Sequence, residues 1–284
     1  MKTNIREQLS SAPKMALVGL VSVISKVRSM KSVKLYGYAT SPFVRKTGCF
    51  LYYKGVNFTH MPVNPIAPDE TIGFTNGTQV PVLEIDGEWK RESSDHAHWL
   101  DQVFPEKPLC PPEHAEKIAE IDDWISHTFL LNIFRPAVDG MVDLKARFRG
   151  WRLAALGSAH TPLPEEVRHM WPDFVSKAPF IQAMAERMDL SESIESAQLR
   201  IGLELAAHIG EGPFIGGFEQ PTMLDLAVFP QLVFGFMFGL EARLSAADHP
   251  VIKSWLARVA EHLPPNPTLI ADWMQIQNLE DALS

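Results

Sequence analysis

The pattern of apolar and polar residues changes its period near residue 104. Before that point, short apolar runs at residues 33–38, 57–61 and 80–85 are typical of buried strands. From about residue 113 onward, apolar positions recur every three or four residues, which is typical of helices. The pattern therefore predicts an α/β domain followed by an all-helical domain.

The first helix of the α/β part has clear end signals. Ser41 supplies a hydroxyl at the cap, and Pro42 falls in the first turn, where its missing N–H costs nothing. Gly55 is a typical stop, so we expect a helix from residue 42 to about residue 54. If this helix is a crossover, the strands on either side of it are parallel and the connection is right-handed.

A hairpin and a second helix complete the first domain. Asp86-Gly87 is a typical tight turn and joins the strand at residues 80–85 to one at residues 88–91. A helix at residues 93–103 follows. The order βαβ and then ββα predicts a small sandwich of the thioredoxin type.

The rest of the chain predicts helices only. A segment with four prolines, residues 105–113, is the expected linker between a first domain at 33–104 and a second at 114–284. Thr222 and Asp225 predict a capping box at the start of one helix. The expected helices are residues 113–136, 143–156, 165–188, 191–209, 222–240 and 250–261.

The N-terminal extension, residues 1–32, predicts an amphipathic helix of its own. Its apolar run is too short and too interrupted for a membrane span, and no cleavage site for a signal peptide follows it. Basic residues flank the apolar positions within residues 14–31. We expect this helix to dock on its own domain or on a partner subunit. The alternative is peripheral contact with a membrane surface.

Composition narrows the function classes. The net charge of -8 disfavours nonspecific nucleic-acid binding. Only two cysteines occur, Cys49 and Cys110, without metal-type spacing, which predicts a reducing, cytoplasmic location and no disulfide framework. Cys49 falls on the expected core face of its helix. His96 and His98 are too close together to chelate from one helix face, so we expect no metal.

Four motifs in order resemble the cytosolic glutathione transferase superfamily. They are residues 38–46, similar to the first turn of its serine-type members; residues 79–83, similar to its cis-proline segment; the acidic residue–serine pair 92–93; and residues 212–225, similar to its late capping motif. The likeness covers about residues 33–263. It implies a thioredoxin-like N-terminal domain, an all-α C-terminal domain and a homodimer.

The resemblance also implies a site for reduced glutathione. Ser41 would stabilise the thiolate; chemically, a hydroxyl at a helix N-terminus can donate to an anion and lower the pKa of a bound thiol. Ser93 would hold the γ-glutamyl carboxylate, and Glu92 the ammonium. The backbone of Val80, before a cis Pro81, would bind the cysteinyl part. The plain alternative is that Ser41 and Glu92-Ser93 only cap their helices.

Two departures from the family pattern affect this site. The family often has a basic residue near the cis-proline segment for the glycyl carboxylate; here that role would fall to Gln79 or Asn76, or to no residue. The omega, glutaredoxin-like and prostaglandin E synthase-2-like relatives have cysteine where this chain has Ser41, which argues against disulfide exchange.

We therefore expect a glutathione transferase-like enzyme that attacks an apolar electrophile. Alternatives are a noncatalytic binding or assembly protein of this fold, with or without membrane association, and a prostaglandin E synthase-2-like isomerase. The second domain supplies aromatic candidates for the electrophile subsite. A basic run predicts a solvated helix face, with contact to an acidic substrate as its alternative; it consists of Lys145, Arg147, Arg149 and Arg152.

Overall fold

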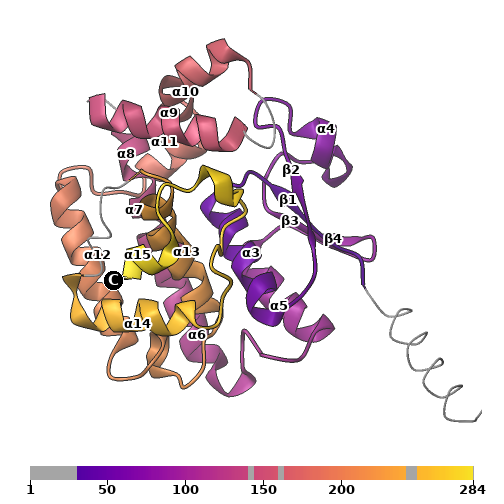
Figure 1. Cartoon of the computed structure of the whole chain (residues 1–284), viewed down its shortest axis with the longest axis vertical. Helices are drawn as coiled ribbons and strands as arrows, with labels where there is room; N and C mark the ends of the chain where they lie inside the picture. Colours follow the sequence, from indigo (N-terminus) through magenta and orange to yellow (C-terminus); the bar gives the residue numbers. More distant parts are fainter. Residues whose placement is uncertain (1–30, 140–143, 159–162, 241–247, 284) are drawn as a thin grey trace, which may run out of the picture.

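The computed structural model describes residues 31–139, 144–158, 163–240 and 248–283. A four-stranded sheet of order β2-β1-β3-β4 comes first, and the described residues that follow it form helices and their connections (Figure 1). The strands are β1 (Val33–Gly37), β2 (Thr59–Pro62), β3 (Val82–Ile85) and β4 (Glu88–Lys90). β1 runs parallel to β2, as the crossover predicts, and β3 runs antiparallel to β4, as the hairpin predicts. β1 and β3 are also antiparallel.

Helices α3 and α5 pack between this sheet and the helices that follow (Figure 1). The helical elements of the first part are α3 (Pro42–Lys54), α4 (Asp69–Ile72), η1 (Gly73–Thr75) and α5 (Ser93–Val103). Those of the second part are η2 (Pro112–His114), α6 (Ala115–Trp124), η3 (Ile125–Phe129), α7 (Leu130–Ile133), α8 (Arg135–Val138), α9 (Leu144–Ser158), α10 (Glu165–Ser176), α11 (Pro179–Ala185), α12 (Ile194–Ile209), η4 (Ile215–Gly217), α13 (Met223–Met237), α14 (Pro250–Ala260), η6 (Asp272–Met274) and α15 (Leu279–Leu283). This confirms the predicted thioredoxin-like plus all-α architecture.

Helix α3 begins and ends where its sequence signals place it. Pro42 occupies the first turn, and Gly55 ends the helix with a φ of 67°, a conformation that favours glycine. Gly37 at the end of β1 lets the helix come close, because a side-chain carbon there would lie 2.3 Å from Val44. The end of β1 and the start of α3 are thus held tightly together.

Two predicted helices prove to be interrupted. The helix expected at residues 113–136 contains a π-helical turn, η3, and is divided into three shorter helices. The helix expected at residues 165–188 breaks at Pro179, because a residue before proline avoids the helical conformation and Ala178 is extended. The predicted N-terminal helix, up to residue 30, lies outside the described residues.

Helix α13 lies at the centre of the helical part. Its contact with α3 is the most extensive contact between any two elements. Thr222 and Asp225 form the predicted capping box, and Asp225 also accepts a hydrogen bond from Trp255 Nε1 at 2.7 Å. Burial raises the pKa of the Asp225 carboxyl to about 6. One continuous apolar cluster includes Leu35 of the sheet and Phe229 of this helix, so both parts share a core.

A buried ion pair joins three helices beside this core. Lys46 of α3 lies 2.9 Å from Asp122 of α6, and its ammonium also donates to Ser94 of α5 at 2.9 Å. The Lys46 side chain is only 1% exposed. The pair is satisfied on both sides, as a buried charge requires, and it fixes the start of α5 against the helical part.

Candidate functional site

A large cleft lies between the sheet part and the helical part, with a volume of about 1790 Å³. Pockets for a single small ligand are usually smaller, about 300–1,000 Å³, so this cleft has room for two ligands. The structure brings all six predicted site residues to its lining, namely Ser41, Gln79, Val80, Pro81, Glu92 and Ser93.

Ser41 lies at the turn from β1 into α3, on the cleft wall. It occupies the N-cap position, but its side chain makes no capping hydrogen bond. Its backbone N–H donates to the Tyr38 carbonyl at 2.9 Å, which fixes the turn. The hydroxyl therefore stands at the positive end of a helix with the capacity to donate to a bound anion.

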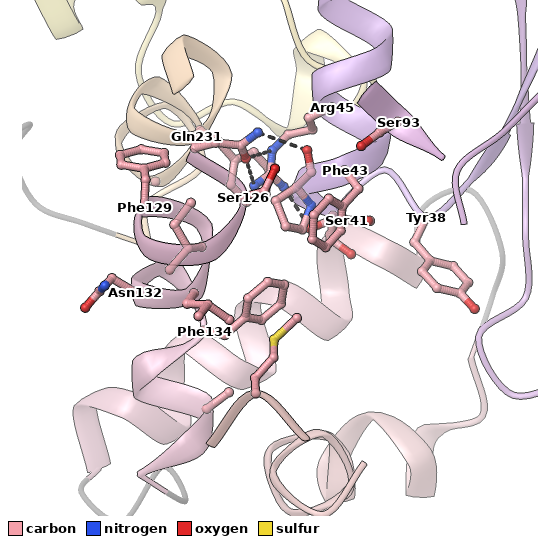
Figure 2. A pocket seen from close by; sticks show the side chains of 18 of the residues that line it. Tyr38, Ser41, Phe43, Arg45, Ser93, Ser126, Phe129, Asn132, Phe134 and Gln231 are labelled. Carbon is pink, nitrogen blue, oxygen red and sulfur yellow. Dashed lines mark hydrogen bonds between the residues drawn. The ribbon is translucent and has the colours of Figure 1, made fainter. Parts of the chain in front are cut away.

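A buried arginine holds this turn from behind. Arg45 donates to the Thr40 carbonyl at 2.7 Å and to Gln231 Oε1 of α13 at 2.7 Å (Figure 2). Gln231 in turn donates to the Pro42 carbonyl at 2.9 Å. The guanidinium also lies 3.7 Å from the centre of the Phe234 ring. Burial lowers the pKa of Arg45 to about 9, so the group stays charged near neutral pH.

Sequence reasoning missed Arg45 and Gln231 as parts of the site. The available signal was a basic residue among the core positions of the helix, where a charge needs a buried partner. No spacing rule could identify that partner, because Gln231 lies 186 positions along the chain.

The segment before β3 forms the floor of the cleft. The Val80–Pro81 peptide bond is cis, as the family resemblance implies. Gln79 lies on the same lining, whereas Asn76, its alternative for the glycyl end, does not. Asn76 instead ends η1 in a left-handed conformation.

The start of α5 forms another wall. Glu92 is its N-cap residue and Ser93 its first helical residue, and neither Glu92 nor Ser41 uses its side chain to cap. Two helix N-termini therefore face the cleft, and both favour negative charge. Glu92 is exposed, and Ser93 is partly buried.

Arg91 is a cation that the sequence analysis did not assign to the site. It lines the cleft beside Glu92 and Ser93. A side-chain carbon on Gly77 would lie 2.5 Å from its Nη1, which places the guanidinium against the loop before Val80. Its guanidinium carbon also lies 5.8 Å from the centre of the Trp89 ring. Among the described residues, none forms an ion pair with Arg91.

Tyr38 supplies the phenol hydroxyl closest to Ser41 in sequence. Figure 2 shows its ring directed away from the group formed by Ser41, Arg45 and Gln231. Burial raises the pKa of the Tyr38 phenol, which keeps it neutral. Ser41 is therefore the better placed of the two to meet a ligand beside that group.

The part of the cleft within the helical region is mainly aromatic. Phe43 of α3 stacks on Phe134 at 6.3 Å between ring centres, and Phe134 meets Phe180 edge-on at 6.1 Å. The π-helical turn η3 contributes Ser126 and Phe129 to the same lining (Figure 2). Such turns often occur at functional sites.

Several further sequence expectations can be checked here. Cys49 is fully buried, as predicted, and burial raises the pKa of its thiol. Among the aromatic residues of the second domain, Phe129 and Phe234 line the cleft, whereas Trp124 and Trp151 do not.

The four basic residues of α9, namely Lys145, Arg147, Arg149 and Arg152, have different surroundings. Arg147 pairs with Asp173 at 2.9 Å, and Arg152 donates to the carbonyls of Phe238 and Met274. Arg149 alone of the four lines the cleft.

Within the described ranges, no three or more His, Cys, Asp or Glu side chains are grouped so as to hold a metal ion. None of the helices that the structure describes has the length and apolar character needed to cross a membrane.

Residues 35–108 match the family model for the glutathione S-transferase N-terminal domain. Similar solved structures include human glutathione transferase theta-2 in complex with glutathione and an unknown ligand; it is 16% identical, with a TM-score of 0.56 over 83% of this chain and 84% of that one. A glutathione S-transferase from Rhodospirillum rubrum F11 is 18% identical, with a TM-score of 0.54 over 80% and 87%. The beta-etherase LigF from Sphingobium sp. strain SYK-6 is 20% identical, with a TM-score of 0.54 over 81% and 98%.

At such identities the structural likeness establishes the fold. Together with the match of the first domain, it confirms the predicted resemblance to the cytosolic glutathione transferase superfamily. The narrower likeness to serine-type or prostaglandin E synthase-2-like members stays a prediction.

Proposed function

We propose that this protein binds reduced glutathione in the cleft and activates its thiolate for attack on an apolar electrophile. Glutathione would lie across the sheet end of the cleft, against Ser41, Val80 and Ser93, and the electrophile would occupy the aromatic part. The complex of theta-2 with glutathione supports a glutathione site on this fold.

One observation carries this proposal: the Ser41 hydroxyl stands at a helix N-terminus in the cleft and is not used as a cap. A hydroxyl that donates to sulfur stabilises the thiolate over the thiol and so lowers the pKa of the bound thiol. The thiol proton passes to solvent, and the thiolate sulfur then bonds to the electrophilic carbon. In a displacement the carbon expels its leaving group, such as a halide ion; in an addition to a double bond the neighbouring atom takes a proton from water. No general base is required for this activation.

Arg91 extends the site at its γ-glutamyl end. The cysteinyl part would meet the backbone of Val80, and α5 begins beyond β4, at the edge of the sheet. A ligand that reaches from Val80 to Ser93 passes Arg91, which lies against the Gly77 loop. We assign the γ-glutamyl carboxylate to Ser93 and Arg91 together, because a guanidinium binds a carboxylate with charge-assisted hydrogen bonds. Glu92 would pair with the ammonium.

The glycyl end is assigned to Gln79, whose side-chain amide can donate one hydrogen bond to a carboxylate. A neutral donor contributes less than a cation, so the γ-glutamyl end would supply more of the affinity for glutathione.

Replacing Ser41 tests the mechanism. Ser41→Ala should lower turnover with a soluble aromatic halide by at least about tenfold, since one donor to a developing or bound anion is removed. The affinity for glutathione should stay within a few-fold, because the other contacts remain. Steady-state kinetics over a pH series, with the thiolate followed by its ultraviolet absorbance, measures both.

The control is Ser176→Ala, which removes a partly buried serine outside the cleft. It should leave turnover and the apparent pKa of the bound thiol unchanged. Turnover of Ser41→Ala equal to that of the unmodified protein would remove Ser41 from the mechanism.

A further inference from the structure

Arg149 is a cation that faces the cleft without a partner in the structure. It is partly buried on α9, and none of the described residues forms a hydrogen bond or an ion pair with it. Of the acidic residues on the same lining, Asp122 and Asp123 pair with Lys46 and His127. Within the described residues, no hydrogen bond or ion pair joins Glu92, Glu195 or Asp248 to Arg149. In the part of the chain that the structure describes, no acidic side chain therefore neutralises Arg149.

The face of α9 that carries Arg149 runs toward the proposed thiol site. Leu153, Ala154 and Gly157 line the cleft from the same helix, and Gly157 lies beside the Thr40 hydroxyl, since a side-chain carbon there would be 3.8 Å away. Eight residues of helix separate Gly157 from Arg149, which is about 12 Å along the helix axis. Arg149 is thus well removed from the sulfur position near Ser41.

The wall on this part of the cleft is apolar. The rings of Phe43, Phe134 and Phe180 contact one another in series, and all three line the cleft. Phe43 belongs to the same helix turn that begins at Ser41. A ligand that lies along these rings would have one end beside the thiolate.

We infer that the electrophile is an elongated, apolar, aromatic molecule that carries an acidic group at the end away from its reacting carbon. Arg149 binds that group, and the Phe43–Phe134–Phe180 wall binds the body. The length of helix between Gly157 and Arg149 sets the scale of the separation between the reacting carbon and the acidic group, about 12 Å. This inference rests on the proposed function, because it places the reacting carbon at the glutathione thiolate.

Two probes that differ only in charge test the assignment. Phenylhexanoic acid and its primary amide are titrated into the full chain, with and without reduced glutathione, and binding is followed by calorimetry at neutral pH. The acid should bind the unmodified protein about five- to tenfold more tightly than the amide, as expected for a charge-assisted contact at a partly exposed arginine. Arg149→Gln should reduce that preference to within twofold and leave the affinity for the amide unchanged.

Lys145→Gln is the matched control, because Lys145 is exposed on the same helix and does not line the cleft. It should keep the full preference for the acid. Equal binding of the two probes to the unmodified protein, an equal loss of both in Arg149→Gln, or the same effect in Lys145→Gln would overturn the inference. So would the absence of binding by either probe.

Reduced glutathione is titrated alone into the same proteins. Absence of glutathione binding would contradict the proposed function, whatever the probes show. Normal glutathione binding without a preference for the acid would contradict only the assignment of Arg149.

Discussion

Within the described residues, no hydrogen bond or ion pair involves the side-chain polar atoms of Ser41 or Arg91. Ser41 makes no capping hydrogen bond, and Arg91 contacts the protein through a ring, that of Trp89, rather than through a carboxylate. Lys46, by contrast, is buried against Asp122 and Ser94 and serves the packing of three helices. At the scale of single residues, the candidates for ligand binding are those that the fold leaves unsatisfied.

Replacing Arg91 tests the γ-glutamyl end of the site. Arg91→Gln should weaken the binding of reduced glutathione by about tenfold, because one charge-assisted contact to a carboxylate is lost. The affinity for cysteinylglycine, which lacks the γ-glutamyl residue, should not change. Calorimetric titration with the two peptides measures the difference.

The neighbouring cation provides the control for this experiment. Lys90 lies 5.4 Å over the Trp99 ring and does not line the cleft. Lys90→Gln should bind both peptides as the unmodified protein does. If Arg91→Gln lowers the affinity for both peptides equally, Arg91 does not bind the γ-glutamyl carboxylate.

At the scale of elements, the contact between α3 and α13 connects the helical part to the turn that carries Ser41. Gln231 accepts from Arg45 and donates to the Pro42 carbonyl, so one amide satisfies both the buried cation and the first turn of α3. A change in α13 should therefore reach the position of Ser41 without touching any ligand.

Gln231→Ala tests this connection. Loss of the hydrogen bond to a buried charge should lower the free energy of unfolding by about 2 kcal/mol and should also lower turnover. Gln231→Glu keeps an oxygen for Arg45 but cannot donate to Pro42. Compared with Gln231→Ala, Gln231→Glu should regain most of the lost unfolding free energy but a smaller share of the lost turnover. Denaturant unfolding and kinetics on the same samples measure the two effects, and full turnover in Gln231→Ala would contradict the account.

His96 gives α5 a pH dependence of its own. Its Nε2–H donates to the Lys90 carbonyl at 2.9 Å, so its Nδ1 accepts from the Thr47 hydroxyl at 3.0 Å and the ring is neutral. Burial lowers the pKa of His96 from 6.5 to about 4. The unfolded chain therefore binds more protons between those values, and this contribution to stability is present above pH 6.5 and is lost as the pH falls toward 4.

We expect His96 to account for a loss of about 2 kcal/mol in unfolding free energy between pH 7 and pH 5. His96→Gln keeps a donor for Lys90 but does not titrate, so its stability should change less over this range. His98→Gln, at an exposed position on the same helix, should behave like the unmodified protein. An unchanged pH profile in His96→Gln would show that His96 is not responsible.

The sequence predicts elements well where their signals are local. Pro42 and Gly55 mark both ends of α3, and Thr222 with Asp225 marks the start of α13. It does not predict the π-helical turn η3, because that turn is an interruption within a continuous helical pattern. The break before Pro179 has a local signal, but the periodicity around it favours one long helix.

Some residues of the candidate site can likewise be predicted from local motifs, and others cannot. Its glutathione end follows from short motifs such as Glu92-Ser93, which occupy the expected place on the cleft. Arg45, Gln231 and Arg149 depend on contacts or exposure that arise only when distant segments meet. Sequence patterns predict the helices and strands. Which side chains face the cleft without a protein partner depends on the tertiary contacts.

At the scale of the whole molecule, the two parts share the largest apolar cluster and both line the candidate cleft. A ligand that binds both walls should therefore stabilise the entire chain rather than one part of it. The predicted homodimer, the cytoplasmic location and the role of residues 1–32 stay predictions, as do the exact domain limits at residues 33–104 and 114–284. The noncatalytic alternative differs from the proposed enzyme most clearly in its response to glutathione.

Thermal and denaturant unfolding of the full chain with reduced glutathione would show whether the cleft binds glutathione. At a concentration one hundred times the dissociation constant, the account predicts about 2.7 kcal/mol of added stability in a single cooperative transition. S-methylglutathione, which has no ionisable thiol, should stabilise the chain less, and Ser41→Ala should reduce the difference between the two ligands. No stabilisation at millimolar glutathione would contradict the account.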